Sequence, residues 1–279
     1  MRRDRRSGIL GPVAAIMELD ALVSSFSRGA RAFVAFVGAG GKTTTMFALA
    51  RRRAVRGTSV LVSTTTRILD PEAASEREGK AFGHVLRLAD PASPESLERI
   101  RAAGSLIVLG SPGDAPDGPG DSPKLLGVYP DCLEALARIF DLVLVEADGS
   151  RGLPIKAPAA HEPVVPSSAT VVIGVIGLDA LGAPLDGRVA HRPELLGPLV
   201  GCAAGEPIEV EHIVGLAASS QGLFKGSPAG AARIVLLNKA DLVSAAKAEA
   251  CASALRAACV ADAVLVGSLI ASSVDGGAA

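Results

Sequence analysis

A glycine-rich turn followed by a lysine and three threonines is the segment with the clearest chemical meaning. Residues 37–45 read Val-Gly-Ala-Gly-Gly-Lys-Thr-Thr-Thr, between an apolar run at 32–37 and a helical pattern at 43–56. Glycines let consecutive N–H groups face one anion, and the positive end of the following helix adds to the attraction. A lysine here supplies charge to the β- and γ-phosphates, and the next hydroxyl binds Mg²⁺.

The segment therefore predicts a nucleotide phosphate site. The residues expected to bind the nucleotide are Gly38, Ala39, Gly40, Gly41, Lys42, Thr43 and Thr44. Lys42 is also expected to be catalytic, and Thr43 to be a metal ligand. The expected cofactor is Mg²⁺, with GTP or ATP as substrate.

The spacing leaves alternatives open. The strict pattern GxxxxGK[ST] fails because Phe36 occupies its first glycine, whereas the shorter GxxGK[ST] fits Gly38–Thr43 and also occurs in Mur-type ligases. A dinucleotide pattern, GxGxxG, would place Thr43 at its third glycine. The next apolar run ends in Ser63–Thr66, without an acid to hold a ribose hydroxyl. Mononucleotide binding is favoured over a plain glycine-rich turn by the strand–turn–helix context.

Two carboxylates follow another apolar run. Residues 141–149 read Asp-Leu-Val-Leu-Val-Glu-Ala-Asp-Gly, so Glu146 and Asp148 lie at the end of an expected strand. Ligands of parallel sheets bind beyond the carboxyl ends of the strands, which predicts that both acids lie near Lys42 and Thr43. We expect Glu146 and Asp148 to be catalytic and to hold Mg²⁺ or orient a water. Glu146–Gly149 also has the ExxG spacing by which some metallochaperone-type GTPases sense the γ-phosphate.

A base-reading motif follows a later apolar run. Asn238-Lys239-Ala240-Asp241 has the form NKxD, in which the aspartate accepts hydrogen bonds from the N1–H and exocyclic amine of guanine. Adenine offers no such pair of donors, so Asn238, Lys239 and Asp241 predict a preference for GTP over ATP. The alternative is an Asx-type turn that leads into the next helix.

The order of apolar runs and helical patterns predicts the fold. Consecutive apolar residues, rather than alternating ones, indicate strands covered on both faces. Expected strands are 32–37, 59–63, 106–109, 142–145, 170–176, 233–237 and 264–266, and expected helices are 43–56, 93–103, 131–140, 209–218 and 244–258. The fold class is α/β, a three-layer and mostly parallel sheet of the P-loop NTPase type. One domain, 1–279, is expected, with its core at about 28–270 and flexible termini and a flexible 110–123 loop.

Composition excludes several classes of protein. The net charge is −1 and aromatic residues make up 3 %, which argues against nucleic-acid binding. No apolar stretch reaches the roughly 18 residues of a membrane span. The apolar run Ile9–Met17 is interrupted by Gly11-Pro12 and lacks a cleavage site, so it does not fit a signal peptide. Four scattered cysteines without a CxxC pair favour the cytoplasm.

The chain as a whole resembles the YqeC family. The matching segments are 37–45, 64–67, 146–163, 191–194 and 238–241, in the family's order. The resemblance implies a P-loop nucleotidase that acts as an accessory protein in maturing the cofactor of a selenium-dependent molybdenum hydroxylase. Its implied partners are a nucleotide and such a hydroxylase or its cofactor-synthesis proteins.

The segment that carries this resemblance contains further candidates. Arg151 is expected to be catalytic, and with Lys156 it could neutralise a transferring phosphate or an anionic cofactor, or both could solvate a loop. His161 with Glu162, and His191 with Glu194, could form a metal or substrate site or be structural. Three activities remain open: NTP hydrolysis, a nucleotide-dependent transferase or ligase, and a non-catalytic nucleotide-gated binding protein.

Overall fold

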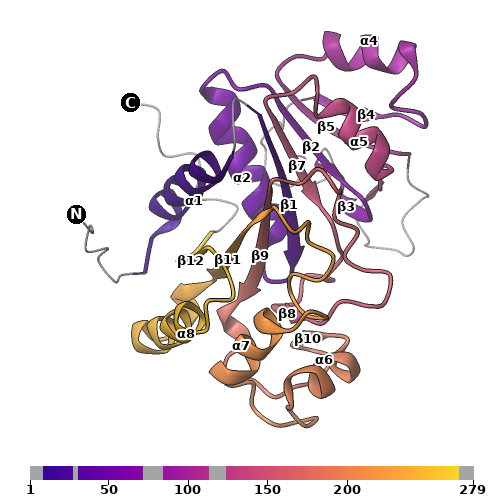
Figure 1. Cartoon of the computed structure of the whole chain (residues 1–279). Helices are drawn as coiled ribbons and strands as arrows, with labels where there is room; N and C mark the ends of the chain where they lie inside the picture. The colour runs from indigo at the N-terminus through magenta and orange to yellow at the C-terminus, as the bar shows by residue number, and fades with distance from the viewer. Residues whose placement is uncertain (1–8, 28–30, 72–83, 113–123, 270–279) are drawn as a thin grey trace.

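A parallel sheet of eight strands forms the centre of the computed structural model, which describes residues 9–27, 31–71, 84–112 and 124–269 (Figure 1). The strands lie in the order β12-β11-β9-β1-β7-β2-β5-β4, and every pairing between them is parallel. Their bounds are β1 Ala32–Gly38, β2 Val60–Thr64, β4 His84–Arg87, β5 Leu106–Gly110, β7 Leu142–Glu146, β9 Val171–Gly177, β11 Ala232–Asn238 and β12 Ala263–Val266.

Helices cover both faces of this sheet. Val34 and Phe36 of β1 pack on the side of α1 (Pro12–Phe26) and α2 (Lys42–Val55). Ala35 and Val37 face the opposite side, which α4 (Pro94–Ala102), α5 (Pro130–Leu136), α7 (Val210–Ala218) and α8 (Ala245–Ala257) cover with the help of α6 (Pro193–Val200). Every residue of β7 and β9 is buried, as in strands covered on both faces. The predicted three-layer α/β fold with a parallel sheet is therefore confirmed.

Local sequence signals explain where several elements begin. Ser93 accepts a hydrogen bond from the amide of Ser96 and caps α4, which starts at Pro94. Ser244 caps α8 in the same way through Lys247. These helices, and all seven expected strands, lie within a few residues of their predicted bounds.

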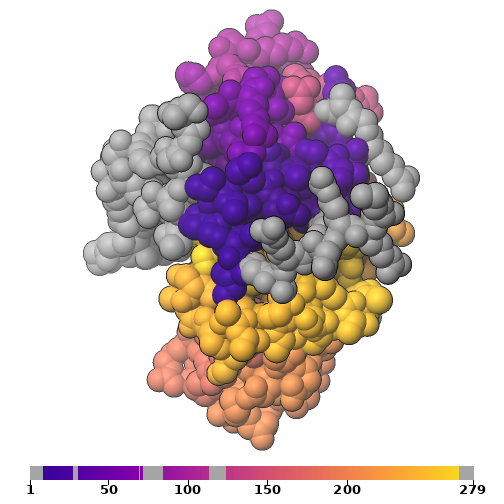
Figure 2. Space-filling view, turned by 90° about the vertical axis from the view of Figure 1, so that its left-hand side faces the viewer, coloured from indigo at the N-terminus to yellow at the C-terminus, as the bar shows by residue number. Residues whose placement is uncertain are grey.

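Other elements were not anticipated from the sequence. α1 contains most of the apolar run at 9–17 and buries Ile16, Leu19 and Val23 against the sheet, so the core begins before residue 28. Figure 2 shows these N-terminal residues, in indigo, against the yellow C-terminal part of the chain. The remaining additions are α6, β4 and the short strands β3 (Arg67–Leu69), β6 (Lys124–Leu126), β8 (Ile155–Lys156) and β10 (Ala190–His191).

The segments expected to be flexible fall largely outside the described residues. This holds for 1–8, for 270–279 and for 113–123 of the expected 110–123 loop. Gly110 itself is the last residue of β5.

The strand order brings the predicted site residues to one edge of the sheet. β7 enters between β1 and β2, which places Glu146 beside Phe36. On the other side of β1, Gly38 pairs with Val175 of β9, and Gly177 of β9 pairs with Asn238 of β11. In Figure 1 the arrowheads of β1 and β9 point toward β8, β10, α6 and α7. Such a switch in strand order is where open α/β sheets bind ligands.

Candidate functional site

The loop that joins β1 to α2, residues 38–44, is called the phosphate loop below. Gly38, Gly40 and Gly41 have positive φ angles of 88°, 85° and 119°, a region that side chains other than glycine rarely occupy. The loop curls directly into the first turn of α2, which begins at Lys42. The glycines of the predicted motif are thus needed for the shape of the turn.

The amides of the phosphate loop divide into two groups. Those of Gly38, Ala39 and Gly40 donate to Asp148 Oδ2, Val175 O and Leu153 O at 3.1, 2.9 and 2.9 Å. The amides of residues 41–44 have no hydrogen-bond acceptor among the described residues, and helical bonding starts with Thr45 N to Gly41 O. Four donors at the positive end of a helix form an anion site. The sequence prediction made no such division: the first three residues fix the loop, and the next four present donors.

Lys42 and Thr43 meet the two acids as predicted. The Lys42 ammonium donates to Gly38 O at 2.6 Å and lies 3.1 Å from Asp148 Oδ1 and 3.8 Å from Glu146 Oε1. The Thr43 hydroxyl donates to Glu146 Oε2 at 2.6 Å. The structure therefore brings Lys42, Thr43, Glu146 and Asp148 together at the phosphate loop.

Burial and charge act against each other on these groups. Burial raises the pKa of Glu146, and the charge of Asp148 adds to this, while Lys42 and the Thr43 hydrogen bond oppose it. Burial lowers the pKa of Lys42, but Asp148 and Glu146 outweigh it, so the net pKa is raised. Lys42 is therefore charged, although its side chain is only 1 % exposed.

A chain of ion pairs continues from Asp148 away from the phosphate loop. The Lys156 ammonium lies 3.1 Å from Asp148 Oδ2 and donates to Gly149 O at 2.7 Å and to Glu162 Oε2 at 2.8 Å. Glu162 also accepts a 2.7 Å hydrogen bond from Arg192. Lys156, at 2 % exposure, does not solvate a loop. Its pairing with two carboxylates was missed, like that of Arg192 with Glu162, because no local sequence pattern signals which acid a loop cation will meet in the fold.

The chain of ion pairs through Glu162 predicts that the free energy of unfolding depends on pH. Burial alone would raise the pKa of Glu162, but hydrogen bonds from Arg192 and Lys156 outweigh it and lower the pKa from 4.5 to about 2. Because the folded-state pKa is the lower one, Glu162 stabilises the fold above pH 4.5, by about 3 kcal/mol, and this is lost as pH falls toward 2. Between pH 5 and pH 3, urea unfolding should show that wild type loses about 2 kcal/mol more than Glu162→Gln.

The matched control is Glu249→Gln. Glu249 pairs with Arg256 at 3.0 Å, with both side chains at least 40 % exposed. Removing an exposed pair changes the free energy of unfolding by less than about 1 kcal/mol. Equal pH profiles for wild type and Glu162→Gln would contradict the assignment.

The predicted base-reading residues lie at the end of β11 and directly after it. Asn238 donates to Gly40 O at 2.8 Å and accepts from the Leu269 amide at 2.8 Å, so it joins the phosphate loop to the segment that follows β12. The exposed Asp241 accepts a short hydrogen bond from Ser268, whose oxygen accepts from the Asp241 amide at 2.9 Å. Lys239 donates to Asp179 at 2.7 Å. Ser268 was missed, although its place directly after a predicted strand could have indicated it.

Several candidate residues are not brought into the phosphate loop. Arg151 is exposed and makes no hydrogen bond or ion pair with any described residue. Glu162 is already engaged by two cations, so it does not pair with His161. Within residues 9–27, 31–71, 84–112 and 124–269, no group of three or more His, Cys, Asp or Glu side chains could hold a metal. The metal sites considered as one alternative for His161 and His191 therefore find no ligand set there.

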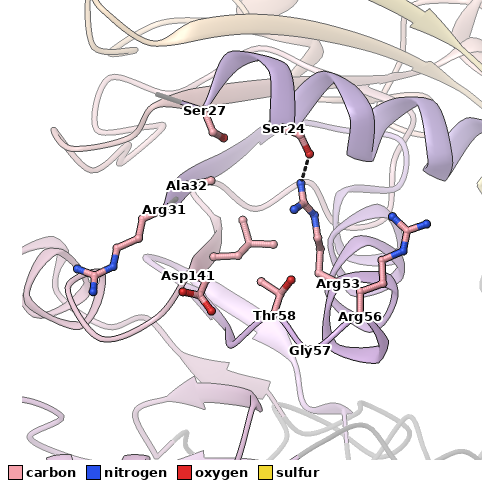
Figure 3. A pocket seen from close by; sticks show the side chains of 10 residues that line it. Ser24, Ser27, Arg31, Ala32, Arg53, Arg56, Gly57, Thr58 and Asp141 are labelled. Carbon is pink, nitrogen blue, oxygen red and sulfur yellow. Dashed lines mark hydrogen bonds between the residues drawn. The ribbon is translucent and has the colours of Figure 1, made fainter. Parts of the chain in front are cut away.

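A separate pocket lies at the opposite edge of the sheet. It has a volume of about 300 Å³ and is lined by Ser24, Ser27, Arg31, Ala32, Arg53, Arg56, Gly57, Thr58, Asp141 and Leu142. Ala32 and Leu142 are the first residues of β1 and β7, so the pocket is remote from the phosphate loop. Figure 3 shows Arg53 turned toward Ser24, while Arg31 and Arg56 extend away from each other. This pocket takes no part in the candidate site.

None of the helices in the described ranges is long and apolar enough to cross a membrane. All four cysteines are free thiols.

Comparison with known proteins agrees with the resemblance to the YqeC family. A family model described as "YqeC protein" matches residues 34–194, which include the phosphate loop, both acids and the Lys156–Glu162–Arg192 chain. An Escherichia coli (strain K12) protein, named "Uncharacterized protein YqeC", is 32 % identical over 208 residues, covering 74 % of this chain and 75 % of the relative. The chain therefore belongs to the YqeC family.

Proposed function

We propose that this protein is a Mg²⁺-dependent nucleoside triphosphatase that prefers GTP to ATP. One observation carries the proposal: four amides at the start of α2, which have no acceptor in the described part of the chain, lie beside a buried ammonium, a hydroxyl and two carboxylates. The amides and Lys42 suit the β- and γ-phosphates of a nucleotide. A phosphate would draw Lys42 from Asp148 and Glu146 and replace their charges.

The side chains near the loop fit a magnesium ion. Thr43 supplies a hydroxyl oxygen, and Glu146 and Asp148 supply carboxylate oxygens, which are the donors that Mg²⁺ prefers. Mg²⁺ binds through one or two carboxylates together with substrate phosphates and water, so it does not need a larger protein cage. The ion would neutralise charge on the transferring phosphate.

Isothermal titration calorimetry and product analysis test the proposal together. GTP should bind more tightly than ATP, and only with Mg²⁺ should orthophosphate be released. Release of pyrophosphate would instead indicate nucleotidyl transfer. Tight binding without either product would indicate a nucleotide-gated binding protein, and no binding would refute the proposal.

The guanine preference rests on Asp241. Its carboxylate is exposed and is held from one side by Ser268, which leaves acceptor capacity for a base. Asp241→Asn should shift the preference from GTP toward xanthosine triphosphate by at least about tenfold, since xanthine lacks the exocyclic donor and the new amide can donate instead. Competition between the two nucleotides, measured as their ratio of dissociation constants, checks this.

Ser268→Ala is the matched control for the effect of Asp241→Asn on base preference. It removes the hydroxyl that positions Asp241 but keeps the carboxylate. We expect GTP affinity to fall several-fold with the order GTP over xanthosine triphosphate unchanged. A wild type that binds GTP and ATP equally would disprove the NKxD assignment.

We further propose, from the family resemblance, that this activity serves cofactor maturation of a selenium-dependent molybdenum hydroxylase. The partner would be such a hydroxylase or a protein that synthesises its cofactor. Capture of either on the GTP-loaded protein, but not on the GDP-loaded protein, is the expected result. Equal capture of the partner by the GTP-loaded and GDP-loaded protein would show that the nucleotide does not control this interaction.

A further inference from the structure

Two arginines, Arg151 and Arg192, have unusual backbone conformations. Arg151 and Arg192 have φ angles of 52° and 65°, a left-handed region that residues with a β-carbon seldom adopt. Arg151 lies five residues after Glu146, the last residue of β7, and Arg192 immediately precedes α6. Each such conformation costs about 1–3 kcal/mol and persists where the surrounding structure imposes it, often at ligand sites.

The short sheet of β8 and β10 links His191 and Arg192 to the segment that contains Arg151, because the Lys156 ammonium of β8 donates to Gly149 O, two residues before Arg151. His191 of β10 pairs in register with Lys156 of β8, and Arg192 follows directly. His191 and Arg192 are half-buried, whereas Arg151 is exposed. Burial lowers the pKa of His191, and the positive charges of Arg192, Lys156 and Arg151 lower it further. The charge of Glu162 opposes this, but the net pKa of His191 is lowered.

The acidic side chains in this region already form ion pairs with buried or half-buried cations. Asp148 lies between Lys42 and Lys156, each 3.1 Å away, and Glu162 lies between Lys156 and Arg192. The buried layer is therefore internally paired. Arg151 is exposed and remains without a counter-charge among the described residues.

We propose that Arg151, His191 and Arg192 form a second anion subsite, which holds the phosphate or carboxylate group of an acceptor molecule beside the nucleotide. Guanidinium groups bind either oxyanion through paired N–H donors, and the imidazole adds one further hydrogen bond. The inference rests on the proposed function for its role, because an acceptor beside a γ-phosphate implies group transfer or coupled hydrolysis. Binding of an anion itself needs no nucleotide.

The probe is orthophosphate, followed through the His191 imidazole signals by nuclear magnetic resonance. In wild type, phosphate should perturb these signals and raise the pKa of His191, because a bound anion favours the imidazolium. Acetate is the second probe, since stronger binding of one or the other separates a phosphate-bearing from a carboxylate-bearing acceptor. Both titrations are repeated with saturating GDP, which leaves the γ-phosphate position open.

Arg151→Gly tests the subsite without a folding cost. Glycine accepts the φ of 52°, so the free energy of unfolding should be unchanged or higher, while phosphate affinity at His191 should fall at least about tenfold. If Arg151 had only a structural role, Arg151→Gly would lower the free energy of unfolding and leave phosphate affinity at His191 unchanged. Arg188→Ala is the control, because Arg188 is an exposed arginine paired with Asp186 in the same part of the chain.

The outcomes separate this inference from the proposed function. If phosphate perturbs only residues 41–44 and leaves His191 unchanged, the second subsite is refuted while the nucleotide site stands. If no nucleotide binds but phosphate still perturbs His191 in an Arg151-dependent way, the subsite stands and the triphosphatase proposal fails. Loss of the His191 response in both Arg151→Gly and Arg188→Ala would indicate general charge attraction and overturn the subsite.

Discussion

Lys42→Ala is expected to reduce nucleotide hydrolysis to below about 1 % of wild type. The ammonium is the one cation of the phosphate loop, and phosphoryl transfer is catalysed by positioning and charge stabilisation, which one such group supports by about 100-fold or more. Nucleotide affinity should fall as well, because the β- and γ-phosphates lose a charge-assisted donor. Orthophosphate release under saturating GTP and Mg²⁺ measures the first effect, and calorimetry the second.

A loss of folding must be separated from a loss of chemistry in this variant. Removing Lys42 leaves Glu146 and Asp148 buried with less compensation, which lowers the free energy of unfolding. Lys156→Met removes the other buried lysine beside Asp148 and should cost similar stability, but it leaves the phosphate loop charged. We expect Lys156→Met to keep GTP affinity within about tenfold. Unchanged turnover in a folded Lys42→Ala protein would remove Lys42 from the mechanism.

The positions of strands and their arrangement in the sheet could be inferred where local sequence signals were strong. Seven of the eight central strands are runs of consecutive apolar residues, and each of these was predicted close to its observed position, whereas β4 was not predicted. Parallel pairing places the carboxyl ends of these strands at a common edge, so the sequence alone predicts Glu146 and Asp148 beside Lys42. The phosphate loop followed from residue type and context alone.

Other features carry no such local signal. β8 and β10 contain two residues each, too few for any periodicity, and they pair across more than 30 residues of sequence. The burial of Lys156 and its pairing with Glu162 could not be predicted, because tertiary contacts bring these side chains and Arg192 together. Because α1 packs on both α2 and the sheet, its apolar residues lie on several sides of the helix. These features depend on how elements pack, which one sequence does not show.

Gly40→Ala is expected to lower the free energy of unfolding by at least about 3 kcal/mol. At its φ of 85° an added Cβ would lie 2.2 Å from Gly177 N and 2.9 Å from Pro154 O, and these backbone atoms belong to β9 and to the segment after Asp148. The loop can relieve the clash only by moving away from β9, which also breaks the 2.9 Å bond from Gly40 N to Leu153 O. Urea unfolding measures the change.

Gly152→Ala separates the clash from the conformational cost. Gly152 has a φ of 75°, yet nothing lies within 4 Å of an added Cβ, so only the strain of a left-handed alanine remains, about 1 kcal/mol. The difference between the two variants therefore measures how tightly the phosphate loop is seated on β9. Equal losses would mean that the loop has room to shift, and the rigid cradle on which the amides of residues 41–44 depend would then be absent.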